Sequence, residues 1–184
     1  MSPRKIAVLT FAAAGLLACD HDPLTVESAR EFAPRARNAV VEQSRGAVQL
    51  PFHGSFTIET SSAFTPPTTL TLNGTANGHA IQLGQFTAAS VDVVNTATST
   101  STGTFTLTAA DGDQLFSTTT GAETEFVPPN VSHITLVATI VGGTGRFAAA
   151  TGTFTVNSVV AIDFASGTSS GSGSFDGLID LNKK

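Results

Sequence analysis

Residues 131–156 read VSHITLVATIVGGTGRFAAATGTFTV, and this stretch sets the first expectation about the fold. The segment before the glycines is rich in Val, Ile and Thr, which favour strands, and a second run of this kind follows them. The glycines at positions 142, 143, 145 and 152 permit the positive φ angles that a tight corner requires. The stretch therefore predicts two consecutive antiparallel strands joined by a compact glycine-rich link.

The same pattern extends over the chain from Ala47 onward, where runs of Thr, Val, Ile and Phe alternate with turn residues. No segment from Ala47 onward has a convincing helical period. Eight strands are expected, at residues 48–60, 69–76, 79–94 with a bend near Gly84, 99–109, 113–120, 131–141, 152–164 and 170–181. Because closure removes exposed sheet edges, strands joined in sequence favour a closed meander. The predicted fold is all-β, an eight-stranded antiparallel meander barrel.

The expected turns differ between the two ends of this barrel. Asn77-Gly78 and Asp111-Gly112 are signals for two-residue hairpins, and they fall at the same rim as the link at residues 142–145. The longer links fall at the opposite rim, at residues 61–68, 95–98, 121–130 and 165–169. One closed rim and one rim of longer loops are typical of a small barrel whose pocket has a mouth. Eight strands leave an interior wide enough for side chains or for one small ligand.

The link GGTGRFAAATG at residues 142–152, with the apolar strand VSHITLVATIVGG before it, resembles the dirigent and allene oxide cyclase superfamily. Those proteins carry a similar Gly-Gly-x-Gly-x-Phe...Gly link between two late strands of an eight-stranded, calycin-type barrel. The resemblance implies this fold for residues 47–181. It implies a corner at Gly142, Gly143, Gly145 and Gly152, and a plug of the barrel end at Phe147.

Activity follows less directly from this resemblance. Plant dirigent proteins steer radical coupling, and the cyclases close an oxylipin ring with polar residues inside the cavity. None of those cavity residues matches a position in this sequence, so the resemblance implies no catalytic residue. With its Thr-rich strands, the chain resembles bacterial secreted relatives of this barrel more than the plant dirigent proteins.

The first residues have the parts of a secretory signal, namely a basic start and the uncharged run IAVLTFAAAGLL at residues 6–17. The sequence LLAC at residues 16–19 resembles a bacterial lipobox. This implies a signal peptide at residues 1–18 and acyl chains, such as palmitate, on Cys19. Two or three chains hold a protein on a membrane. We expect an exported protein, lipid-anchored to the inner or outer membrane of a bacterial cell envelope; an ordinary signal peptide is the alternative.

Residues 19–46 differ in composition from the rest and are expected to form a flexible tether. Four arginines lie in this segment: Arg30, Arg35, Arg37 and Arg45. The simplest interpretation is a solvated linker that lifts the barrel domain, residues 47–184, off the lipid. Contact of the arginines with anionic lipid headgroups is the alternative.

Composition excludes several classes of partner and cofactor. The net charge of -5 argues against nucleic acid. The single cysteine rules out an internal disulfide and a CxxC metal or redox site. The barrel segment has three histidines, His53, His79 and His133. His79 is expected at the closed rim and His133 at the mouth, too far apart to share one metal ion. We therefore expect no metal and no cofactor.

Acidic side chains gather at the expected mouth. Between residues 47 and 182 the chain has nine carboxylates and one Lys or Arg, which is Arg146. The carboxylates expected near the mouth are Glu59, Asp92, Glu123, Glu125 and Asp163. A ring of carboxylates there could attract a cation or a basic ligand, and solvation of the surface is the alternative. Arg146 is expected on the outside, paired with Asp111 or Asp113, with ligand binding as the alternative.

The favoured function is non-enzymatic binding of a small apolar ligand at the cell envelope. Its candidate contacts are Phe56, Ile58, Leu72, Phe86, Phe105, Ile134, Leu136, Phe154 and Val156. One alternative is a cyclase- or isomerase-type enzyme of the superfamily, which needs polar groups inside the barrel, and the pattern places none clearly inward. Another is a structural or interaction module with a filled barrel. Relatives often oligomerise through barrel faces, and the sequence fixes no stoichiometry.

Overall fold

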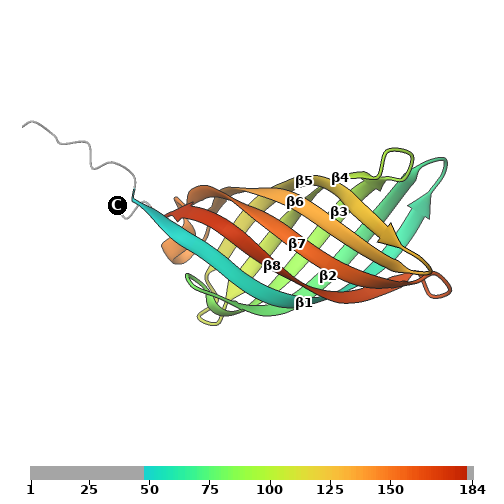
Figure 1. Ribbon diagram of the computed structural model, residues 1–184. Coiled ribbons are helices and arrows are strands. Elements are labelled where there is room, and N and C mark those ends of the chain that lie inside the picture. The colour runs from blue at the N-terminus through green and yellow to red at the C-terminus, as the bar shows by residue number, and fades with distance from the viewer. Residues whose placement is uncertain (1–47, 182–184) are drawn as a thin grey trace, which may run out of the picture. The chain divides into compact units, whose positions relative to one another are not determined.

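The computed structural model describes residues 48–181, which form a closed barrel of eight antiparallel strands in sequence order (Figure 1). The strands are β1 (Gln49–Thr65), β2 (Thr69–Ala80), β3 (Gly84–Asn95), β4 (Thr100–Ala109), β5 (Gln114–Val127), β6 (Val131–Gly143), β7 (Thr151–Asp163) and β8 (Thr168–Asp180). This confirms the predicted fold class. The predicted signal peptide (1–18), Cys19 and the predicted tether (19–46) lie outside the described residues.

Side chains alternate between the interior and the outer wall along the strands, as a period of two requires, and the alternation shifts at a bulge in β5. In β1, for example, Phe52, Phe56 and Ile58 face inward, whereas His53 and Thr57 between them are exposed. Strand β1 closes the barrel by pairing with β8, in a register that runs from Gln49 opposite Asp180 to Ser61 opposite Thr168. The Thr-rich faces of the strands thus lie on the outside.

The two ends of the barrel are built differently. At one end, here called the floor, lie the turns at residues 81–83 and 110–113 and a short 3-10 helix, η1 (Gly145–Phe147), between β6 and β7 (left in Figure 1). At the opposite end, here called the mouth, the strands are joined by turns at residues 66–68, 96–99, 128–130 and 164–167. The Pro66-Pro67 and Pro128-Pro129 peptide bonds, both at the mouth, are cis.

The hairpin predicted at Asn77-Gly78 is wrong, and so is the bend predicted within a strand at Gly84. Strand β2 continues to Ala80, the turn lies at residues 81–83, and Gly84, with φ of 68°, is the first residue of β3. Gly78 faces the interior, where a Cβ atom would come within 2.6 Å of the Phe86 ring. This glycine therefore makes room for an aromatic ring instead of forming a turn.

The strands at the mouth are longer than predicted. Strand β1 runs to Thr65 and β5 to Val127, so most of the predicted links 61–68 and 121–130 is paired sheet. These segments are rich in Ser, Thr and Glu, which resemble loop composition. Each segment pairs with its hairpin partner, β1 with β2 as far as Thr65 and β5 with β6 as far as Val127. This pairing occupies backbone groups of the segment and overrides the composition signal.

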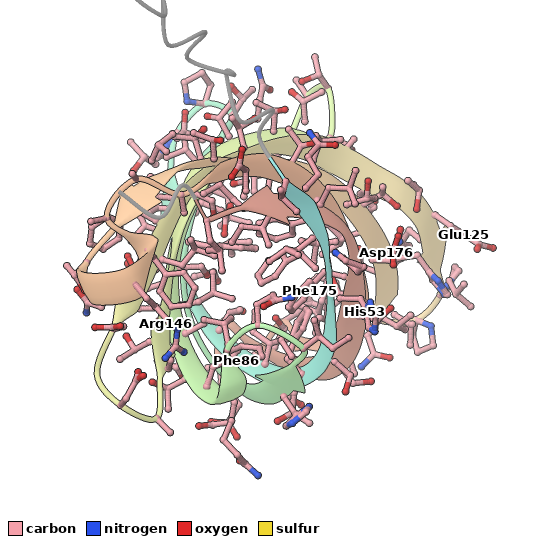
Figure 2. The ribbon with its side chains drawn as sticks, turned by 90° about the vertical axis from the view of Figure 1, so that its left-hand side faces the viewer. His53, Phe86, Glu125, Arg146, Phe175 and Asp176 are labelled. Carbon is pink, nitrogen blue, oxygen red and sulfur yellow. The ribbon has the colours of Figure 1, made fainter. Side chains whose placement is uncertain are left out.

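The floor half of the barrel is filled by an aromatic cluster. The ring centroids of Phe52, Phe154 and Phe175 lie 4.9 to 5.3 Å apart, and the Phe86 ring lies 6.1 Å from that of Phe175. Viewed along the barrel from the floor, Phe86 and Phe175 lie inside the ring of strands (Figure 2). Phe147 of η1 is fully buried with this core. The packed core therefore occupies the floor half of the interior.

Candidate functional site

The mouth half of the interior is a cavity of about 470 Å³. This volume falls within the range typical of small-molecule sites, about 300–1,000 Å³. Phe56, Phe105 and Val156 line its inner part and also a pocket of about 30 Å³ that leads toward the aromatic cluster. At the other end, Phe126 and Phe164 line the cavity at the mouth. The barrel is thus packed at the floor and hollow toward the mouth.

Most of the cavity wall is apolar. The inward side chains predicted from alternation that line it are Phe56, Ile58, Leu72, Phe105, Ile134, Leu136 and Val156. The two remaining candidates, Phe86 and Phe154, belong to the aromatic cluster and line the small pocket beneath. Serine and threonine hydroxyls supply most of the polar part of the wall.

Asp92 is the carboxylate that lies deepest in the cavity wall. It projects inward from β3 and its side chain is 9% exposed. The Thr119 hydroxyl on β5 donates a hydrogen bond to Asp92 Oδ1 at 3.1 Å, and the Ser90 hydroxyl also donates to this carboxylate. Burial raises the pKa of Asp92 above its ordinary value of 3.8, and the two hydrogen bonds oppose this rise.

This placement overturns the expectation that no polar group clearly faces inward. In the run Ser90-Val91-Asp92, alternation exposes Val91 on the outer wall and turns Ser90 and Asp92 toward the interior. Asp92 is an even number of residues from the inward Phe86 on the same strand, so alternation by itself predicts an inward Asp92 side chain. Position along the strand, taken alone, predicts only that Asp92 lies near the rim.

Glu123 is the second carboxylate of the cavity, and it lies near the mouth. The Ser132 hydroxyl on β6 donates a hydrogen bond to Glu123 Oε2 at 2.6 Å, and both residues line the cavity. The register between β5 and β6 shifts between Glu123 and Glu125, which marks a β-bulge. Glu123 and Glu125 lie opposite the adjacent residues Ile134 and His133, so the bulge turns Glu125 outward although Glu123 lines the cavity.

The remaining carboxylates predicted at the mouth lie on the outer surface. Glu59 and Asp163 line a shallow groove outside the barrel. Glu125 points away from the ring of strands (Figure 2). A hydrogen bond from the Ser166 side chain, together with those from the backbone N–H groups of Ala165 and Ser166, lowers the pKa of Asp163. Of the five acids, the structure thus brings Asp92 and Glu123 to the cavity.

The glycine-rich corner at the floor positions Phe147 and Arg146. Gly142, Gly145 and Gly152 have φ angles of 123°, 51° and 142°, whereas Gly143 ends β6. Phe147 is fully buried, and the Arg146 guanidinium lies over its ring with Cζ 4.7 Å from the centroid. On the outside, Arg146 pairs with Asp111 and its backbone N–H donates to Asp113 Oδ2 at 3.0 Å. This arginine is therefore remote from the cavity.

The histidines do not gather at a site. His53 and His79 are exposed on the outer wall, His133 is half-buried, and His53 lies opposite Asp176 in the β1–β8 register. Among residues 48–181 there is no group of three or more His, Cys, Asp or Glu side chains that could hold a metal ion. Within the same residues, no helix is long and apolar enough to cross a membrane.

Solved structures of dirigent proteins resemble this barrel. The pterocarpan synthase dirigent protein GePTS1 aligns with a TM-score of 0.50 and 15% identity, over 74% of this chain and 87% of that one. The pterocarpan synthase dirigent protein PsPTS1 aligns with a TM-score of 0.43 and 14% identity, over 72% and 97%. No family model and no curated protein matches the sequence. At 15% identity the likeness to GePTS1 establishes a dirigent-like barrel fold.

Proposed function

We propose that this protein is a lipid-anchored component of a bacterial cell envelope that binds a small, mostly apolar ligand inside its barrel. The observation that carries the binding function is the cavity of about 470 Å³, with an apolar wall and an opening at the mouth. A site of this kind gains affinity from buried apolar area and orientation from a few polar groups. Asp92 and the hydroxyls around it are those groups.

The anchoring part of the proposal depends on Cys19. The lipobox-like sequence at residues 16–19 supports acylation of its thiol, and the arginine-containing tether would then hold the barrel near the lipid surface. Labelled palmitate should be incorporated into the wild-type protein in its bacterial host. The variant Cys19→Ser should incorporate none, because it lacks the thiol that is acylated. Equal labelling of both proteins would overturn the anchor.

A binding test requires protein without detergent, because detergent competes for an apolar cavity. The mature chain carrying Cys19→Ser meets this requirement, since it lacks the acylated thiol. N-phenyl-1-naphthylamine, a neutral dye that fluoresces in apolar surroundings, then reports occupancy. We expect saturable binding of one dye per chain, and native mass spectrometry of the same protein should detect any ligand retained from the host.

Two tryptophan variants locate the bound dye. Ile134→Trp projects an indole into the cavity from β6, whereas Val137→Trp adds the same side chain on the outer face of that strand, where Val137 is 49% exposed. Ile134→Trp should weaken dye binding and Val137→Trp should leave it unchanged, provided that both variants retain the far-ultraviolet spectrum of the barrel. Absence of dye binding to the parent, or equal binding to both variants, would refute a binding cavity.

A second candidate function is a cyclase- or isomerase-type enzyme, and the observation that favours it is Asp92. Buried carboxyls with a raised pKa are suited to exchange protons with a bound substrate. GePTS1, which shares the fold, is described as a pterocarpan synthase dirigent protein. If the ligand is converted, Asp92→Asn should retain binding and lose turnover. Unchanged turnover in this variant would exclude Asp92 as the proton donor or acceptor.

A further inference from the structure

The cavity carries negative charge without compensation. Asp92 and Glu123 line it, and no Lys, Arg or His does so. Within residues 48–181, the single Lys or Arg is Arg146, which lies at the floor and pairs there with Asp111. A bound anion would thus meet two carboxylates and no cation. Like charges in a site of low dielectric repel strongly, so fatty acids and other apolar anions are disfavoured.

Asp92 is placed to recognise a positive group. Its carboxylate lines the cavity while Thr119 and Ser90 hold it from the barrel wall. Gly103, the partner of Asp92 in the β3–β4 register, leaves the space that this carboxylate occupies. A buried carboxylate is stabilised in its charged form by a nearby cation, which offsets the loss of hydration. The apolar wall that includes Ile58 and Leu72 can receive the rest of the same molecule.

The two carboxylates lie at different depths. Glu123 is exposed near the mouth and is hydrogen-bonded by Ser132, whereas Asp92 is buried. A molecule that enters from the mouth passes the first charge before it reaches the second. A cleft lined by charge of one sign concentrates ligands of the opposite sign, so Glu123 contributes to entry and Asp92 to the final contact.

We infer that the ligand is an amphipathic organic cation, such as an apolar amine, whose body fills the cavity and whose positive head pairs with Asp92. This inference rests on the proposed binding function and specifies its ligand class. It differs from the simplest expectation for a Phe- and Leu-lined barrel, which is a neutral hydrocarbon or a fatty acid. The charge of the head group, with the apolar body held constant, is the variable that tests it.

The test compares three probes of equal chain length: decylamine, decanol and decanoate. Each displaces N-phenyl-1-naphthylamine from the mature Cys19→Ser chain at pH 7, below the concentration at which it forms micelles. We expect decylamine to act at a concentration at least about tenfold lower than decanol, the fold-change that a charge-assisted contact typically supplies. Decanoate should be the weakest competitor.

Two further variants assign the preference to the cavity. Asp92→Asn should reduce the preference for decylamine over decanol to about twofold or less. Glu125→Gln removes one charge from the outer wall close to the mouth and should leave the preference intact. Decanol or decanoate competing as well as decylamine would overturn the inference while the binding cavity stands, and so would an unchanged preference in Asp92→Asn. Failure of the dye itself to bind would overturn the binding function as well.

Discussion

Gly103 on β4 lies opposite Asp92 on β3, and the Asp92 carboxylate occupies the space where a side chain at position 103 would lie. A Cβ atom built on Gly103 overlaps Asp92 Oδ1 and comes within 2.5 Å of the Val91 carbonyl oxygen. Glycine in a strand often marks such a close approach. The barrel therefore accommodates an inward carboxylate by omitting the side chain beside it.

Gly103→Ala should consequently destabilise the barrel. Overpacking in a filled site costs about 1–3 kcal/mol, and backbone as well as side-chain atoms resist the new methyl group. Denaturant unfolding of the Cys19→Ser chain measures the change. Thr104→Val, an exposed position next to it, should alter stability by no more than about 0.5 kcal/mol. An unchanged unfolding midpoint in Gly103→Ala would contradict the close approach of the two residues.

The barrel itself was predictable because local and global signals agree along most strands. Alternation with period two, β-branched residues and turn residues at regular intervals all favour the same register. In β7, for example, Phe154, Val156 and Val160 are buried and the alternate positions face outward. Strands in sequence order also leave few arrangements other than a closed meander.

The wrong predictions concern residue types that occur in two structural roles, such as glycine, which forms turns and also leaves space for a neighbouring side chain. Asn77-Gly78 predicts a turn, but Gly78 makes room for the Phe86 ring inside the barrel. Position near a strand end predicts Asp92 at the rim, whereas Gly103 and Thr119, which accommodate its carboxylate inside the barrel, are distant from it in sequence. Such pairings across strands depend on the tilt and register of the closed sheet, which a single sequence does not specify.

Asp92→Asn should raise stability at neutral pH. Because burial raises the pKa of Asp92, the folded protein holds this proton more tightly than the unfolded chain does. Stability therefore falls as pH rises from about the ordinary value of 3.8 through the raised pKa of the folded state. Asparagine retains an oxygen that can accept the Thr119 hydrogen bond and carries no charge. Its advantage should be largest near pH 7 and should shrink below the ordinary pKa.

Thermal unfolding between pH 3 and pH 7 tests this dependence, and the difference between wild type and variant cancels the titration of the other acids. Asp176→Asn removes the same charge from an exposed position on β8 and serves as the control. If the stability gained by Asp92→Asn instead grew toward acid pH, the folded state would favour the ionised carboxylate.

Phe147→Ala should be the most destabilising of these variants. Phe147 is fully buried in η1 and closes the floor of the barrel, and truncation of a buried Phe costs about 3–5 kcal/mol. Phe64→Ala removes the same ring at a position 57% exposed, where a loss of about 1 kcal/mol or less is expected. Denaturant unfolding of both variants measures the contrast. Equal losses would mean that Phe147 does not hold the floor closed.

Arg146→Ala should have a small effect although Arg146 lies in the same corner. The side chains of Arg146 and Asp111 are 38% and 50% exposed, and exposed ion pairs contribute about 0–1 kcal/mol. The hydrogen bond from the Arg146 backbone N–H to Asp113 remains in the variant. Because salt screens exposed charges, the deficit of the variant should shrink when unfolding is measured in 1 M sodium chloride. A loss above about 2 kcal/mol, or one that salt leaves unchanged, would instead mean that packing of the guanidinium on Phe147 holds the corner.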